Sequence, residues 1–151
     1  MNWKGRFLAL LTVLVLGVGL AACGSGSDSD GSDGDQPSNA VTGIDWQLLN
    51  IASSDGWATG LPSGVDPPTV RFDDGKVEVF AGCNTGSGSA EVGDADIVFG
   101  PIAMTMKSCD ATINQIEKIV TGVLKGKATY TIKAGNLNLT KGKITLIYSQ
   151  G

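Results

Sequence analysis

The sequence predicts an α+β domain in which an antiparallel, strongly curved sheet or open barrel of about seven to eight strands packs on one α-helix. Two observations support this prediction. Short segments of alternating apolar and polar residues recur between tight turns, as is typical of antiparallel strands. One segment instead has apolar residues at helical spacing, and the apolar stripe of a lone helix must be covered by the sheet.

The strands are expected to begin after Gly43. Asp45–Ile51 reads as the first strand, and a polar, glycine-rich connection, Ser53–Pro68, follows it. A hairpin comes next, because alternation continues on both sides of the turn at residues 73–75. The remaining strands are weaker, but turn residues bound each of them. The expected strand ranges are 45–51, 69–72, 76–81, 88–92, 96–99, 128–133, 136–140 and 143–148.

The single predicted helix spans Ala111–Lys125. Asp110 can cap its first turn, and Gly126 can take the left-handed conformation that often ends a helix. Its apolar stripe consists of Ile113, Ile116, Val120, Val123 and Leu124. If the sheet covers this stripe, the domain has a packed core and its function lies on the outside.

The first 22 residues predict an export signal rather than part of the fold. Lys4 and Arg6 precede an uncharged apolar run at residues 7–20, which has the length of a signal-peptide core. The run ends in Leu-Ala-Ala-Cys, which resembles the lipobox of bacterial lipoproteins. We therefore expect cleavage before Cys23 and lipidation of its thiol, palmitate being a typical acyl group. The alternative is an ordinary signal peptide or a short anchor.

A tether is expected to follow, from Cys23 to residue 42, with the domain occupying residues 43–151. The tether is rich in Gly, Ser and Asp and has too few apolar residues to fold, so we predict that it is disordered. A calcium loop is the alternative, but the aspartates lack the spacing and closing glutamate of an EF-hand. This organisation predicts a protein anchored to the cell membrane or outer membrane and facing the extracytoplasmic side.

Composition disfavours several function classes. The chain has a net charge of −4 and contains no histidine. An acidic protein has no general attraction for nucleic acid. Without histidine, the commonest general base and metal ligand is missing. We expect no enzyme activity, no catalytic residue, no cofactor and no metal site.

Cys83 and Cys109 are the two cysteines that remain after Cys23. In an exported domain such a pair favours a disulfide, which would add about 3.5 kcal/mol of stability in the chain-entropy model. Two buried, reduced thiols are the alternative.

Three other features have both a structural and a functional interpretation. The glycine-rich stretch 82–89 could hold phosphate, but a strand rather than a helix follows it, so a turn in which Asn84 bonds its own backbone fits better. Thr105, Ser108 and Cys109 are possible nucleophiles, but the chain has no histidine to activate them, which leaves a pair such as Ser108 with a lysine as the alternative. Trp57 lies in the connection and either anchors a partner or folds back to plug one end of the barrel.

The two halves of the domain differ in charge. Residues 43–100 contain nine acidic and two basic residues, whereas residues 101–151 contain two acidic residues and seven lysines. This asymmetry could orient the domain on an anionic membrane surface. Alternatively, the topology interleaves the two halves and the charges mix.

One set of motifs resembles a known family. Gly82-Cys83-Asn84, followed by Phe99-Gly100-Pro101-Ile102-Ala103 and by a threonine four residues before Cys109, is similar to the META/HslJ domain. Trp46 matches the tryptophan of that family's first strand. The basic residue that many members carry after the motif threonine is replaced here by Met106, with Lys107 following it.

The resemblance covers residues 43–151 and implies a barrel-like sheet wrapped on a helix, often in a lipoprotein. Bacterial members are linked to heat shock and novobiocin resistance, and protozoan members to virulence and secretion; the fold also resembles lipid-binding pilotins. No catalytic residues come with the family. We therefore expect a non-catalytic envelope lipoprotein with a stress-related or partner-binding role. The alternative is a module that holds a lipid or a small apolar ligand.

Overall fold

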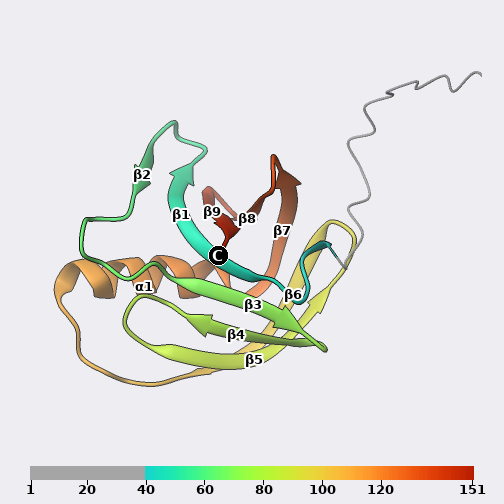
Figure 1. Ribbon diagram of the computed structural model, residues 1–151, viewed down its shortest axis with the longest axis horizontal. Helices are drawn as coiled ribbons and strands as arrows, with labels where there is room; N and C mark the ends of the chain where they lie inside the picture. Colours follow the sequence, from blue (N-terminus) through green and yellow to red (C-terminus); the bar gives the residue numbers. More distant parts are fainter. Residues whose placement is uncertain (1–39) are drawn as a thin grey trace, which may run out of the picture. The chain divides into compact units, whose positions relative to one another are not determined.

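A computed structural model describes residues 40–151 as a closed, eight-stranded antiparallel barrel with one additional strand and a single α-helix (Figure 1). This confirms the predicted α+β class. The predicted signal peptide 1–22 and the lipidation site Cys23 lie outside the described residues. The elements, in chain order, are β1 (Asp45–Ser53), β2 (Ala58–Gly60), β3 (Thr69–Asp73), β4 (Lys76–Phe80), β5 (Thr85–Val92), β6 (Asp96–Met104), α1 (Ala111–Val123), β7 (Gly126–Lys133), β8 (Asn136–Lys141) and β9 (Ile144–Gln150).

Strand β1 closes the barrel. From β3 to β9 each strand pairs with the next strand in the sequence, and β9 pairs back with β1 from Trp46↔Gln150 to Ser53↔Ile144. The other edge of β1 is shared, because β3 pairs with its first three residues and β2 with residues 50–52. The barrel is therefore a simple meander in which sequence neighbours are also spatial neighbours.

Strand β2 lies inside the segment that was predicted to be a connection without strands. Its three residues, Ala58–Gly60, are all exposed and show no alternation of apolar and polar side chains, so the usual signal of a strand is missing. A tight turn after β1 brings them back onto residues 50–52, and the Ser53 amide donates a hydrogen bond to the Trp57 carbonyl at 2.8 Å.

Strands β5 and β6 are longer than predicted because a β-bulge absorbs the residues that resemble strand breakers. Their register shifts between Gly88 and Ala90, opposite the segment that contains Pro101, and pairing resumes as far as Gly86↔Met104. Proline is tolerated at such a bulge, since its missing N–H is not needed there.

Gly88 is needed where β5 and β6 approach each other at this bulge. A Cβ atom on Gly88 would lie 2.6 Å from the Pro101 carbonyl oxygen and 3.0 Å from the Ile102 Cα, so backbone atoms would have to move. By contrast, a Cβ atom on Gly122, in the last turn of α1, would have no neighbour within 4 Å.

We predict opposite effects for alanine at these two glycines. Gly88→Ala should lower the free energy of unfolding by about 2 kcal/mol, because the clash is with backbone. Gly122→Ala should raise it by about 0.5–1 kcal/mol, because alanine is the better helix former. Urea denaturation of the two variants beside the parent protein measures both changes. Equal effects at the two positions would contradict the close approach of the strands.

The interior of the barrel is filled by side chains. Trp46, Phe72 and Tyr148 are at most 1% exposed, and the Phe72 and Phe99 rings pack with their centroids 6.1 Å apart. The Tyr148 hydroxyl is buried without a hydrogen-bond partner among residues 40–151, and this burial raises the pKa of Tyr148 well above its ordinary value. Such packing leaves the interior occupied by the protein itself.

The packing begins before Gly43. Val41 is completely buried, and its carbonyl accepts a hydrogen bond of 2.9 Å from the Trp46 indole. Thr42 forms a bridge with Phe72. The last residues of the segment that was predicted to be a tether therefore belong to the core.

Helix α1 lies across one end of the barrel and contacts β8 and β9 (Figure 1). The Asp110 carboxylate accepts hydrogen bonds from the Thr112 and Ile113 amides, which confirms the predicted cap. Gly126 has a positive φ of 63°. Of the predicted stripe, all members except the half-buried Ile113 are buried. Within residues 40–151, no helix has the length and apolar character needed to cross a membrane.

Candidate functional site: a buried motif cluster and an outer groove

The two motif cysteines join the connection between β4 and β5 to the loop that precedes α1. Cys83 and Cys109 form the predicted disulfide, with their Cα atoms 6.2 Å apart. The Cys83 residue is 7% exposed, so this bond lies mostly inside the protein. It closes the loop of chain that contains β5 and β6.

Asn84, the residue beside this disulfide, is the buried polar residue of the described core, at 3% exposure. Its amide oxygen accepts hydrogen bonds from the Thr105 hydroxyl at 2.8 Å and the Lys107 amide at 2.6 Å. Its amide nitrogen donates to the Glu117 carboxylate at 3.1 Å and to the Lys107 carbonyl at 3.3 Å. The Asn84 backbone amide also donates to Glu117, at 2.9 Å.

We call Asn84, Thr105, Lys107 and Glu117 the Asn84 clip. It fastens the start of β5 to the loop before α1 and to the helix itself. The side chain of Asn84 uses both donors and both acceptor positions, so no polar capacity remains for a ligand. The expectation that Asn84 would bond only its local turn is therefore corrected: its side chain bonds residues more than 20 positions away.

Glu117 was not identified from the sequence. It directly follows Ile116, a residue of the apolar stripe, on an amphipathic helix. A carboxylate on such a helix is ordinarily in contact with solvent. Its partial burial and its contacts with Asn84 are visible only after β5 and α1 are packed together. The available signal was the placement of an acidic residue next to Ile116, in the buried part of the helical repeat.

The two possible hydroxyl nucleophiles, Thr105 and Ser108, lie in different surroundings. The Thr105 hydroxyl donates to Asn84 and accepts a hydrogen bond of 3.2 Å from the Thr85 amide. Ser108 is exposed, and in the described part of the chain it makes no hydrogen bond to a lysine. Among residues 40–151, no group of three or more His, Cys, Asp or Glu side chains is placed to hold a metal ion.

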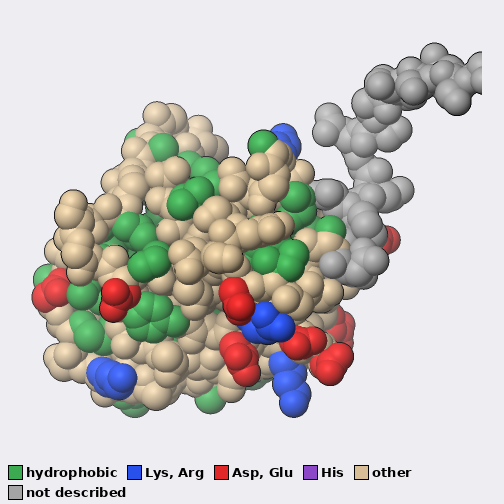
Figure 2. Space-filling view, viewed as in Figure 1, with side chains coloured by type: hydrophobic (Ala, Val, Ile, Leu, Met, Phe, Trp, Pro, Cys, Tyr) green, Lys and Arg blue, Asp and Glu red, His purple; other side chains and the backbone are tan. Residues whose placement is uncertain are grey.

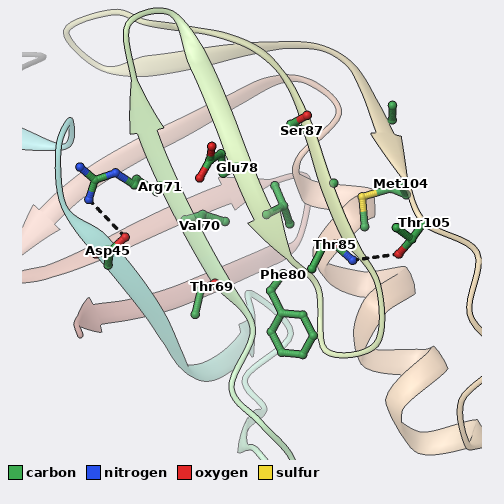
Figure 3. Close-up of a pocket in the computed structure, with 13 residues that line it drawn as sticks. Asp45, Thr69, Val70, Arg71, Glu78, Phe80, Thr85, Ser87, Met104 and Thr105 are labelled. Carbon is green, nitrogen blue, oxygen red and sulfur yellow. Dashed lines mark hydrogen bonds and ion pairs between the residues drawn. The ribbon is translucent and has the colours of Figure 1, made fainter.

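A groove of about 630 Å³ crosses the outer face of β3, β4, β5 and the end of β6 (Figure 3). The strand register aligns one row of its residues, Asp45, Arg71, Glu78, Ser87 and Ala103, across five strands. A second row places the half-buried Phe80 between Thr69 and Thr85. We call this surface the outer groove.

Arg71 is the ion-paired basic residue of the outer groove. Arg71 donates to the Asp45 carboxylate at 3.2 Å and lies 3.7 Å from Asp73. Glu78, its cross-strand neighbour, is exposed. The groove thus offers an ion-paired guanidinium, an aromatic ring and the Glu78 carboxylate, which forms no ion pair with another described residue; such side chains are suited to contacting a polypeptide.

The two charged halves of the sequence stay apart in the fold. Because the barrel is a meander, the acidic half occupies β1–β6 and the lysine-rich half occupies α1 and β7–β9. Figure 2 shows acidic and basic side chains close together toward the lower right of the face in view, and a smaller group of both signs toward the left. Only Lys127 and Lys143 of the second half pair with acids of the first, Asp96 and Asp55.

Trp57 has an intermediate position. It precedes β2 and is 44% exposed, so part of its surface packs on the protein and part faces solvent. It neither plugs the barrel, whose interior is filled by other side chains, nor lies in the outer groove. Its predicted role as a partner anchor stays a prediction.

The family model of the META domain matches residues 39–150. No curated protein matches the sequence. Among solved structures, the NMR structure of a protein from Burkholderia xenovorans is 22% identical, with a TM-score of 0.65, and the match covers 87% of this chain and 99% of that one. A second NMR structure of a protein is also 22% identical, with a TM-score of 0.61, and covers 76% and 95%.

A lipocalin-like protein from Bacteroides uniformis is more distant, at 19% identity and a TM-score of 0.48, with 74% of this chain and 99% of that chain covered. At these identities the two NMR structures support the fold and nothing beyond it.

Proposed function

This chain belongs to the META domain family, and we propose that its domain is a non-catalytic module that binds a protein partner outside the cytoplasm while Cys23 anchors it to a membrane. Envelope stress is the condition in which we expect that partner to be engaged. The observation that carries the proposal is the filled barrel beside the fully used Asn84 clip. The side chains inside the barrel and the polar groups of the Asn84 clip are all used in contacts within the domain. We therefore expect a partner to bind on the outer surface.

The outer groove is the surface that we propose for the partner. It is open and extended rather than enclosed, and it combines Arg71, Phe80 and Met104. Arginine, methionine and aromatic residues are enriched in protein interfaces. The alternative, a lipid or small apolar ligand inside the barrel, is disfavoured because Trp46, Phe72 and Tyr148 already fill that space.

Anchoring supports the same function. The sequence before the described residues resembles a lipobox, and a flexible tether would let the domain search the space near the membrane. Lipidation with two or more acyl chains would be needed for stable attachment, because one chain binds only marginally.

Site-specific photocrosslinking in cells tests this proposal. A photoreactive phenylalanine at Ser87, in the middle of the outer groove, should give one discrete protein adduct. The same probe at Thr131, which is exposed on β7, should not give it. Arg71→Glu should weaken the Ser87 adduct, and Cys23→Ala should remove the acyl mass. Equal adducts from both positions, or normal maturation of Cys23→Ala, would count against the proposal.

A further inference from the structure

The barrel has a seam where β6 separates from β7. Strand β7 pairs only with residues 96–99 of β6, whereas β5 continues to pair with β6 as far as Met104. Within the described chain, residues 100–104 thus have a strand on one side only. The Pro101 carbonyl lies toward β5, so the missing proline N–H does not interrupt the opposite edge. A strand paired on one side presents unpaired N–H and C=O groups on the other.

A groove of about 540 Å³ runs between this edge and helix α1. We call it the seam groove. Its apolar lining comes from Val79, Ile102, Met104 and Leu124. Gly122 leaves room on the helix side, because no atom lies within 4 Å of the position that a Cβ on it would take. The groove therefore keeps space beside an open strand edge.

Two lysines border the seam groove. Lys118 lies in α1, Lys125 follows the end of the helix by two residues, and both line the groove. Both are exposed, and neither has an acidic partner among the described residues. Glu117, the nearest carboxylate in sequence to Lys118, is committed to Asn84.

We propose that the seam groove binds an extended polypeptide segment of alternating apolar and acidic residues, which adds as a strand to the open edge of β6. Backbone hydrogen bonds to β6 would supply affinity, apolar side chains would enter the groove, and carboxylates would meet the two lysines. A single-chain lipid fits less well, because its one anionic head group would satisfy one lysine and would leave the strand edge unpaired.

This site goes beyond the proposed function, because it lies between β6 and α1 rather than over the outer face of β3, β4 and β5, although Val79 and Met104 line both grooves. The acidic character of its ligand follows from the separation of charge in the fold. The lysine-rich half has five lysines without a carboxylate partner in the described part of the chain, and two of them border this one groove.

Fluorescence anisotropy with a labelled octapeptide of alternating valine and glutamate tests the proposal on the full-length chain. We expect saturable binding that weakens about tenfold or more in Lys118→Glu/Lys125→Glu. The matched control Lys76→Glu/Lys133→Glu makes the same charge change at two exposed lysines outside the groove and should retain most of the affinity. Gly122→Leu should abolish binding by filling the groove, without lowering the melting temperature.

The peptide backbone and the competing ligand class are tested in the same assay. The octapeptide is N-methylated either on all its valines or on all its glutamates. Alternate residues of an extended peptide direct their N–H groups to the same edge, so one of the two methylated peptides should lose its hydrogen bonds to β6 and no longer bind. Equal binding by both methylated peptides and the parent, or unchanged binding by Gly122→Leu, would overturn the proposal. The proposal would also be overturned if palmitate bound saturably and Gly122→Leu blocked that binding, while the octapeptide did not bind at all. A failure of photocrosslinking at Ser87 leaves this result unaffected.

Discussion

Replacing Asn84 by aspartate should lower the free energy of unfolding by about 4 kcal/mol at pH 7, because it leaves a buried and unpaired negative charge. The change removes the side-chain N–H groups that bond Glu117 and the Lys107 carbonyl. It also places a second carboxylate beside the Glu117 carboxylate. The acceptor bonds from Thr105 and Lys107 would remain, so the loss isolates the donor side of the clip.

The pH dependence of this variant has a definite sign. Repulsion from Glu117 and burial both raise the folded-state pKa of the introduced carboxyl above its unfolded value. Its destabilising effect is therefore largest where that group is ionised and should shrink as the pH falls toward about 4. Urea denaturation at several pH values measures the trend.

Asn114→Asp is the matched control for this prediction. The Asn114 side chain donates one hydrogen bond of 2.8 Å to the Cys109 carbonyl, close to the clip but in an exposed position. Its loss should cost about 1 kcal/mol or less. If both substitutions had the same small effect, the Asn84 clip would not be a principal source of stability.

Removing the disulfide should have the second-largest effect. In Cys83→Ala/Cys109→Ala the unfolded chain regains the freedom of a loop with a sequence separation of 26. The chain-entropy model gives a loss of about 3.5 kcal/mol, a large share of the stability of a small domain. The urea midpoint of this variant, beside that of the parent protein with and without reductant, measures the change.

Reduction of the parent protein is the control for this second prediction, since it breaks the same bond without changing the sequence. A reduced parent that unfolds at the same urea concentration as the oxidised one would contradict the prediction. The effects of the disulfide and of Asn84 should not be additive, because both hold the loop before α1 against β5.

Sequence reasoning identified most of the fold because the relevant signals are local. The hairpin turn at residues 73–75, the Asp110 cap and the alternation along β7–β9 all depend on residues close in sequence. β2 escaped because pairing with β1, rather than its own pattern, makes it a strand. The second half of β6 was missed because Pro101 usually stops a strand and only the bulge opposite it permits pairing.

The site was less predictable because its parts are distant in sequence. The disulfide could be predicted from the sequence because Cys83 and Cys109 are the two cysteines that remain once Cys23 is assigned to lipidation, and the structure contains that disulfide. The partnership of Asn84 and Glu117 spans 33 positions and needs both β5 and α1 in place. The same applies to the outer groove and the seam groove, which arise from strand register and from the point where β6 leaves β7.

The central claim is that the motif residues of this domain build its fold, so that recognition is left to its surface. Amide hydrogen exchange at Lys107 tests it most directly. Lys107 is in an exposed loop, yet its amide donates a hydrogen bond of 2.6 Å to the buried Asn84 side chain. We predict that this amide exchanges as slowly as core strand amides, while its exposed neighbours Met106 and Ser108 exchange rapidly. Equally fast exchange at all three positions would contradict the claim.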